Sequence, residues 1–286
     1  MKALLKHLKL LEALPYMLRD LTNSRTTLSL AFAYLIPPKL RNLGFYPRII
    51  KTVDNLNLYL NDYTTLHVNI PDQYIRREYE LHPNYIPGKG WTVLDIGAYI
   101  GLYSLRVSKL VGSEGLVVAF EPNPYAFWWL KNNIKLNRVK NVKALPIALG
   151  DHKGFIELYI VTRGNIGASS MVYDHIRAKL NKEVYEFKVI KVPMYRLEDI
   201  ILAISSLRAC NIDLAKIDVE GAELKVLKGS KKLLEKHVIE RFVIELHVDV
   251  VNETSIIKSL RNYDYKIDKL VSFGKTKKIL YAKCAR

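Results

Sequence analysis

Apolar and polar positions along the chain predict alternating strands and helices in its C-terminal two thirds. Short apolar runs rich in β-branched residues are followed by segments whose apolar residues recur every three or four positions, the patterns of strands and helices. We expect strands at residues 91–95, 115–120, 142–148, 155–161, 186–192, 214–219, 241–248, 265–271 and 278–284, and helices after Gly101 and at residues 125–136, 197–206, 223–236 (with Gly229 as a candidate break) and 254–262. This alternation predicts an α/β fold with a doubly wound, mostly parallel sheet, and the last two strands predict an antiparallel hairpin at one edge.

The beginning of the chain follows a helical pattern. Leucines recur at helical spacing within residues 1–21, with lysines towards another side, so we expect a basic amphipathic helix. A second short helix is expected at residues 26–36, where Pro37 and Pro38 end it. The first helix could lie on an anionic membrane or on a partner, but docking on its own domain is the stronger expectation. The apolar stretch at residues 28–36 is too short to span a bilayer.

A change of pattern after these helices predicts a small hairpin and then a domain boundary. Residues 48–69 alternate between apolar and polar positions, which predicts an antiparallel hairpin with its turn at Asn61-Asp62. Prolines and glycines cluster at residues 83–90 and break any regular element there. We therefore expect an N-terminal region at residues 1–87, which could contact the substrate or form a homo-oligomer, and a second domain at residues 88–286.

Charge and cysteine content bear on the partners and the location. The chain has 286 residues, with 44 lysines and arginines against 28 acids, a net charge of +16. This charge predicts an anionic partner, such as nucleic acid or a membrane surface, or else only a basic surface. Cys210 and Cys284 form neither a disulfide framework nor a zinc pattern. We therefore expect a cytoplasmic protein, with peripheral membrane attachment as the alternative, and the single glutamine, Gln73, hints at a thermophile.

A glycine loop after the first strand of the second domain is the main binding signal. An apolar run ends at Asp95, and Gly97 and Gly101 follow before a helical pattern begins, so a ligand can approach the backbone closely at the start of a helix. The loop lacks the G-x-G-x-x-G fingerprint of dinucleotide binding, because Gly97 and Gly101 are its two glycines and Leu102 follows them in place of a further glycine. Asp95 would also repel a pyrophosphate. S-adenosylmethionine, which carries positive charge and no phosphate, fits the loop better.

Further polar residues follow the other predicted strands. Glu121 lies 26 positions after Asp95, the distance expected when one helix separates two strands, and a carboxylate there can accept hydrogen bonds from both hydroxyls of a ribose. Asp218 and Glu220 follow the strand at 214–219, and His247 ends a later strand together with Glu245. Because ligands bind beyond the carboxyl ends of parallel strands, these residues are candidates for one site.

Five segments in order resemble the FkbM-type S-adenosylmethionine-dependent methyltransferases. They are Val-Leu-Asp-Ile-Gly-Ala-Tyr-Ile-Gly at 93–101, Phe-Glu-Pro-Asn-Pro at 120–124, Ala-Leu-Gly-Asp at 148–151, Ile-Asp-Val-Glu-Gly-Ala-Glu at 217–223 with Val-Leu-Lys-Gly at 226–229, and Ile-Glu-Leu-His at 244–247. The resemblance covers the chain from about Gly90 onwards and implies the class I methyltransferase fold, most often with O-methylation of hydroxyls on sugars or natural products. Tyr99 departs from the family pattern, which often has asparagine there.

The resemblance also implies a cofactor site. Its residues are Asp95, Gly97, Ala98, Tyr99 and Gly101 at the methionine end, Glu121 at the ribose with Asn123 in support, and Leu149, Gly150 and Asp151 beside the adenine. The cofactor is then S-adenosyl-L-methionine. The acceptor is expected where the fourth strand of the sheet ends.

The chemistry expected at that end is proton removal from a hydroxyl. Asp218, Glu220 or His247 could serve as the base, and the alternative is that they hold a divalent cation, although no metal is our leading expectation. Glu223 is expected to stabilise the first turn of a helix. His247 could equally be a histidine at a strand end whose hydrogen bonds are satisfied within the fold.

The leading function is O-methylation of a sugar, glycan or small metabolite. The alternatives are methylation of RNA or protein, and a non-catalytic scaffold that binds a membrane or partner.

Overall fold

The computed structural model describes residues 49–61, 65–163, 169–171, 186–203 and 211–285. The chain divides into two compact units, Met1–Glu78 and Tyr79–Arg286, whereas the sequence places the boundary after residue 87. Tyr79 and Tyr85 pack into a hydrophobic core of the second unit, which explains the earlier boundary in the structure. The expected helices at 1–21 and 26–36 lie outside the described residues. Among the described helices, none has the length and apolar character needed to cross a membrane.

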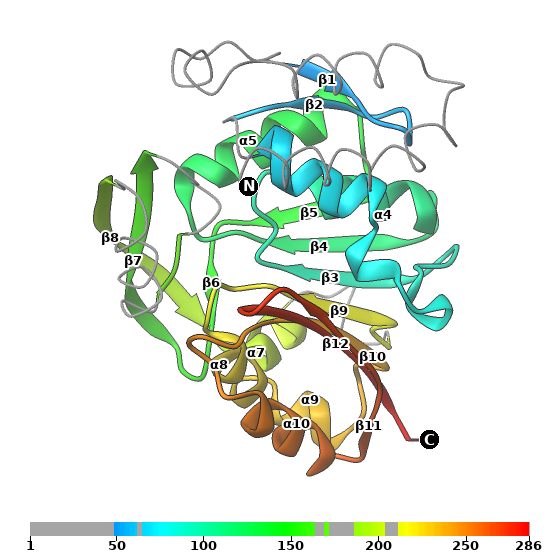
Figure 1. Ribbon diagram of the computed structural model, residues 1–286, viewed down its shortest axis with the longest axis vertical. Coiled ribbons are helices and arrows are strands. Elements are labelled where there is room, and N and C mark those ends of the chain that lie inside the picture. Colours follow the sequence, from blue (N-terminus) through cyan, green and yellow to red (C-terminus); the bar gives the residue numbers. More distant parts are fainter. Residues whose placement is uncertain (1–48, 62–64, 164–168, 172–185, 204–210, 286) are drawn as a thin grey trace, which may run out of the picture. The chain divides into compact units, whose positions relative to one another are not determined.

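The second unit is built on one seven-stranded sheet (Figure 1). Its strands are β3 (Thr92–Ile96), β4 (Leu116–Phe120), β5 (Val142–Leu145), β9 (Leu214–Ile217), β10 (Arg241–His247), β11 (Tyr265–Phe273) and β12 (Lys277–Cys284). Their order is β11-β12-β10-β9-β3-β4-β5. The pairs from β10 to β5 are parallel, while β12 is antiparallel to both β10 and β11. The structure thus confirms a mostly parallel sheet with an antiparallel hairpin at one edge.

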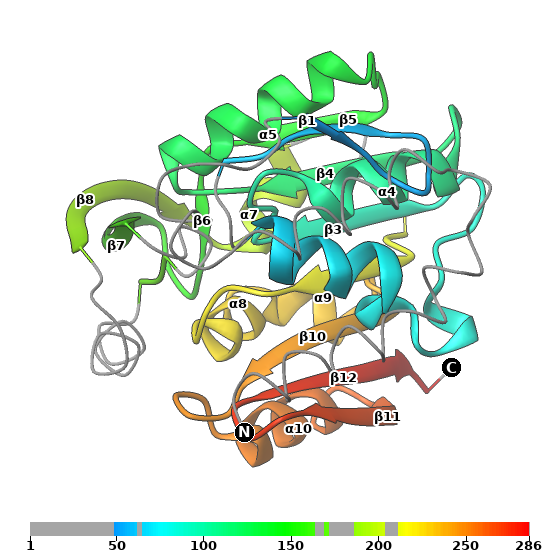
Figure 2. The ribbon, with the colours of Figure 1, turned by 45° about the horizontal axis from the view of Figure 1, so that its top comes forward.

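Helices cover both faces of this sheet, as Figures 1 and 2 show. The helices α4 (Leu102–Val111) and α5 (Pro124–Leu136) lie on one face, and α7 (Leu197–Ala203), α8 (Glu223–Lys228), α9 (Lys231–Glu235) and α10 (Glu253–Arg261) lie on the other. Alternate residues of β3 enter different cores: Val93 packs with residues of α4, and Leu94 packs with residues of α7 to α10. A strand buried on both faces must be apolar throughout, which is why β3 reads as a continuous apolar run up to Asp95.

The break in the helix expected at residues 223–236 is confirmed. Gly229 separates α8 from α9, and a Cβ atom at this position would lie 1.8 Å from the carbonyl oxygen of Gly150. Only a residue without a side chain fits there. The Val-Leu-Lys-Gly segment therefore matters because it lets α8 approach the turn after residue 149.

A second, three-stranded sheet follows β5 and was not expected. The strand expected at 142–148 is divided into β5 and β6 (Ala148–Leu149), and β6 pairs in parallel with β8 (Glu186–Tyr195), which is antiparallel to β7 (Gly154–Arg163). Pro146 lies in the break between the two short strands, and proline has no backbone N–H for a sheet hydrogen bond. The last residues of the helix expected at 197–206 lie outside the described residues.

The first unit contains the expected hairpin, but its turn was placed wrongly. The strands β1 (Ile49–Lys51) and β2 (Asn57–Tyr59) are antiparallel, and Thr52 N donates a hydrogen bond to Leu56 O across the turn. Asn55 adopts a φ of 60° in this turn, a conformation that asparagine tolerates well. After Asn61 the chain resumes with helical turns from residue 65, and Asp62 lies outside the described residues.

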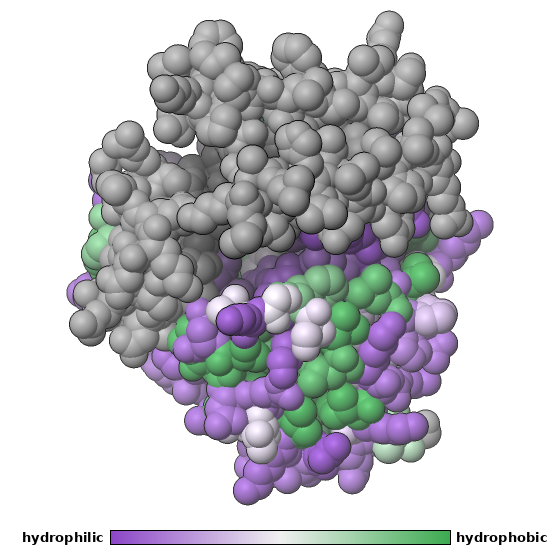
Figure 3. All heavy atoms as spheres, in the orientation of Figure 1, coloured by the Kyte–Doolittle hydropathy of each residue, from purple (hydrophilic) through white to green (hydrophobic). Residues whose placement is uncertain are grey.

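Hydrophobic residues also reach the surface of the second unit. On the face in Figure 3 they gather over the antiparallel edge of the main sheet, with hydrophilic residues around them. The edge strand β11 carries one large apolar side chain, Leu270, that is 37% exposed. This edge lies across β10 from the parallel strands whose carboxyl ends form the candidate site.

Candidate functional site

The glycine loop between β3 and α4 is shaped by close contacts of its backbone. Gly97 and Gly101 have φ values of 81° and 90°, which favour glycine. The N–H groups of Gly97 and Ala98 donate hydrogen bonds to Phe120 O at 3.0 and 2.9 Å. A Cβ atom on Gly97 would lie 1.7 Å from the carbonyl oxygen of Asp218. The loop therefore passes directly against the end of β9, so the two sequence motifs meet in space.

Tyr99 continues this loop in an unusual backbone conformation. Its φ is 51°, a left-handed value that asparagine and glycine adopt more easily than an aromatic residue does. Its N–H group donates a hydrogen bond of 2.7 Å to Glu121 Oε2. The tyrosine therefore makes this main-chain contact with Glu121 in spite of a conformation that aromatic residues rarely adopt.

Asp95 supports the loop from the side of the sheet. Its side chain is fully buried, Ser104 Oγ donates a hydrogen bond of 2.6 Å to Oδ2, and Lys216 Nζ lies 3.2 Å from Oδ1. Both carboxylate oxygens are thus engaged within the protein. Asp95 thus holds α4 and Lys216 together beside the loop.

Lys216 is a site residue that the sequence reasoning missed. It is 2% exposed, donates a hydrogen bond of 2.7 Å to Gly97 O, and lies 3.5 Å from Asp218 Oδ2. Burial alone would lower the pKa of Lys216, but the charges of Asp95 and Asp218 outweigh burial and raise that pKa. A lysine in an apolar strand, two positions before Asp218 and so on the same face, was the available signal.

Glu121 and Asn123 lie where β4 ends, as predicted. Glu121 Oε1 accepts a hydrogen bond from Asn123 N at 2.8 Å, and its Oε2 accepts the one from Tyr99. Burial raises the pKa of Glu121 to about 7, although these two hydrogen bonds oppose the rise. Asn123 supports Glu121 through its backbone, while its side chain caps α5 by accepting from Tyr125 N and its Nδ2 donates to Ser169 Oγ.

The turn at residues 149–151, which is expected beside the adenine, is held by contacts with neighbouring parts of the protein. The Leu149 side chain is buried in the main core, and Gly150 N donates a hydrogen bond to Tyr195 O. Asp151 is exposed, and its Oδ1 lies 2.8 Å from His152 Nδ1. These contacts fix the turn against β8 and α8. Its place beside the adenine stays a prediction.

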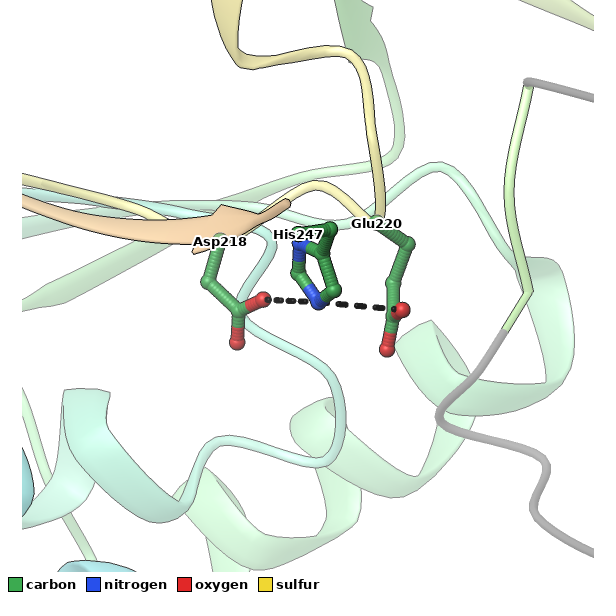
Figure 4. A group of neighbouring side chains, drawn as sticks. All are labelled: Asp218, Glu220 and His247. Carbon is green, nitrogen blue, oxygen red and sulfur yellow. Dashed lines mark ion pairs between the residues drawn. The ribbon is translucent and has the colours of Figure 1, made fainter. Parts of the chain in front are cut away.

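Acids from two strand ends converge on one imidazole, as Figure 4 shows for Asp218, Glu220 and His247. His247 Nε2 lies 3.2 Å from Glu220 Oε2 and 3.9 Å from Asp218 Oδ1, with the ring between the two carboxylates. One ligand atom from each of these residues lies within 4.8 Å of the others. The structure therefore brings all three predicted catalytic residues together, and we call them the strand-end cluster. Glu220 adopts a φ of 52° there.

Two further acids complete the surroundings of His247. The fully buried Glu223 places Oε1 2.8 Å from His247 Nδ1 and also accepts a hydrogen bond from Gly221 N, so it does more than stabilise a helix turn. Glu245 Oε1 lies 3.7 Å from His247 Nε2. The carboxylates of Glu220 and Glu223 raise the pKa of His247 well above its usual value against the opposing effect of burial.

Tyr79 joins two acids at the strand ends, Asp218 and Glu245. Its hydroxyl donates to Glu245 Oε2 at 2.7 Å and lies 3.0 Å from Asp218 Oδ2. Burial, followed by the charge of Asp218, raises the pKa of Glu245 to about 7. The glycine loop, Lys216 and the strand-end cluster thus form one connected network.

Comparisons with known proteins identify the family of this chain. The chain matches the family model described as Methyltransferase FkbM domain over residues 95–267, more than half of its length. Methyltransferase 1 of Beauveria bassiana (strain ARSEF 2860) is 29% identical over 212 residues, 69% of this chain and 80% of that protein. Methyltransferase sdnD of Sordaria araneosa is 33% identical over 156 residues, 48% of this chain and 59% of that protein.

Solved structures of methyltransferases are also similar. The crystal structure of methyltransferase FkbM from Methylobacillus flagellatus KT has 16% identity and a TM-score of 0.47, and the match covers 77% of this chain and 54% of that one. This chain therefore spans about half the length of that protein. The crystal structure of an S-adenosylmethionine-dependent methyltransferase from Aquifex aeolicus has 17% identity and a TM-score of 0.43. The match covers 78% of this chain and 94% of that one.

The family match includes the predicted motifs from Asp95 to His247, so the resemblance read from the sequence is confirmed. The seven-stranded, mostly parallel sheet is also the class I methyltransferase fold that the resemblance implied. The chain therefore belongs to the FkbM methyltransferase domain family and is an S-adenosylmethionine-dependent methyltransferase.

Proposed function

We propose that this enzyme methylates a hydroxyl group on a sugar, a glycan or a small metabolite. The supporting observation is the strand-end cluster, whose Asp218 adjoins the glycine loop at Gly97. A hydroxyl becomes a good nucleophile when it loses its proton, and carboxylates held beside the acceptor can take that proton. The side chains of Asp218 and Glu220 are 22% and 17% exposed, so a ligand can reach them.

The residues of the glycine loop fit S-adenosylmethionine. Gly97 lets the loop pass directly against the end of β9, where a Cβ atom would lie 1.7 Å from Asp218 O. Each oxygen of Glu121 accepts one backbone hydrogen bond, and a second lone pair on each can accept from a ribose hydroxyl. When bound, the cofactor supplies a methyl group activated by a positively charged sulfur.

The chain's own residues then have two tasks. They orient the acceptor so that its oxygen faces the methyl carbon, which removes much of the entropic barrier. They also receive the proton that the hydroxyl gives up as its oxygen gains the methyl group. Asp218 and Glu220 are the proposed proton acceptors, and Lys216 holds Asp218 in place from inside the sheet at 3.5 Å.

Methyl transfer to a panel of acceptors tests this proposal. With radiolabelled S-adenosylmethionine we expect label in hydroxyl-bearing sugars or metabolites, as a methyl ether that survives alkaline treatment. The Asp218→Asn variant should lose about 100-fold or more in kcat while its affinity for the cofactor changes little. Label found only in RNA or in protein would contradict the proposal.

The affinity for S-adenosylmethionine should fall as the pH falls below 7. Glu121 offers both oxygens as strong acceptors for the two ribose hydroxyls when it is ionised, and its pKa is raised to about 7, so the protonation that increases from pH 8 to pH 6 weakens these hydrogen bonds. We expect the Kd to be about tenfold higher at pH 6 than its plateau value at high pH. Calorimetric titration across this range is the measurement. Glu121→Gln, which cannot ionise, should show weak binding without this dependence, and parallel profiles would contradict the assignment.

A further inference from the structure

The donor set of the strand-end cluster is that of a metal site. An imidazole nitrogen and two carboxylate oxygens are ligands that first-row divalent metal ions accept. Ligand atoms about 2.1 Å from one ion lie roughly 3–4 Å apart around it. The separations of 3.2 and 3.9 Å from His247 Nε2 to the two carboxylates agree with this spacing. The longer one exceeds a hydrogen bond, and the Asp218 carboxylate is held instead through its Oδ2 by Tyr79 and Lys216, which leaves Oδ1 facing the imidazole.

A buried acid outside the three ligands orients the imidazole. Glu223 is 0% exposed and holds His247 Nδ1 at 2.8 Å, which turns Nε2 towards Asp218 and Glu220 (Figure 4). A carboxylate on the second ring nitrogen is the usual companion of a histidine that binds a metal. The other oxygen of Glu223, Oε2, is buried without a hydrogen-bond partner among the described residues.

The charge around His247 also favours a cation. Four carboxylates, from Asp218, Glu220, Glu223 and Glu245, lie within 3.9 Å of its ring nitrogens. Two lysines lie beside these acids, with Lys216 Nζ 3.5 Å from Asp218 and Lys277 Nζ 3.7 Å from Glu245, both longer than a metal–oxygen bond. A divalent ion would offset several of these charges at once.

We propose that Asp218, Glu220 and His247 bind one divalent first-row metal ion, for which Mn²⁺ is the probe. Magnesium fits less well, because it prefers oxygen ligands alone. Binding of the ion does not depend on the acceptor, but its use in catalysis rests on the proposed function. In catalysis the ion would lower the pKa of an acceptor hydroxyl that it contacts, and a carboxylate oxygen of Asp218 or Glu220 that is not bound to the ion would take the proton.

Titration of the full chain with Mn²⁺, followed by the electron paramagnetic resonance signal of the free ion, tests the proposal. We expect one bound ion per chain. His247→Ala and Glu220→Gln should abolish this binding, and Glu223→Gln should weaken it about 10–100-fold. Glu235→Gln is the matched control, because Glu235 is an exposed acid on α9. Circular dichroism shows whether each variant is folded.

The outcomes separate the metal site from the methyltransferase function. Wild-type protein that binds S-adenosylmethionine but no Mn²⁺ overturns the metal site alone. Binding that persists unchanged in folded His247→Ala and Glu220→Gln places the ion elsewhere and also overturns the proposal. Mn²⁺ binding lost in these variants but retained in Glu235→Gln supports the metal site, whether or not the cofactor binds in the same samples.

Discussion

Replacing Lys216 with methionine is expected to lower the free energy of unfolding by about 3–5 kcal/mol, the usual cost of removing one partner from a buried ion pair. Lys216 is 2% exposed and lies 3.2 Å from the fully buried Asp95. Methionine fills a similar volume but leaves that carboxylate without its cation. The variant also loses the hydrogen bond to Gly97 O, so the glycine loop should lose its position. Urea unfolding measures the effect.

Two variants control the Lys216 experiment. Lys231→Met removes a lysine whose side chain is 63% exposed and whose partner Glu235 is also exposed, so its cost should stay below about 1 kcal/mol. Asp95→Asn combined with Lys216→Met removes both charges and should recover part of the loss. A Lys216→Met variant as stable as Lys231→Met would show that the network of Lys216 is not needed for the fold.

Glu121→Ala is expected to weaken S-adenosylmethionine binding about 100-fold or more. Hydrogen bonds to a charged group contribute about 1.5–3 kcal/mol each, and two ribose hydroxyls lose their acceptor together. The substitution also removes the acceptor of the Tyr99 N–H in the glycine loop. Glu114→Ala is the matched control, since Glu114 is an exposed acid in the turn before β4.

The sequence sufficed for the parts of the site that lie where strands end. Asp95, Glu121, Asp218 and His247 each follow or close an apolar run, and parallel strands bring their carboxyl ends to one edge. The order of elements therefore predicted both the α/β sheet and the meeting of these residues. The motifs of the family then predicted S-adenosylmethionine as the cofactor, with Asp95 and Glu121 in its site.

Contacts between distant segments could not be read from the sequence in the same way. Tyr79 and Glu245 are 166 positions apart, and no local pattern marks the tyrosine as a partner of the acid. Glu223 looked like an ordinary acid at a helix start, because its contact with His247 depends on how α8 packs beside β10. The hairpin turn at Asn55 was missed since Asn61-Asp62 carried an equally good turn signal.

Calorimetric titration of S-adenosylmethionine into the wild-type chain and into Glu121→Ala tests the central claim most directly. The claim is that the cofactor binds between the glycine loop and Glu121, where β3 and β4 end. It predicts binding of one cofactor per wild-type chain and a loss of about 100-fold in affinity in Glu121→Ala, with Glu114→Ala unchanged. A wild-type chain that binds no S-adenosylmethionine, or equal affinity in Glu121→Ala, would contradict it.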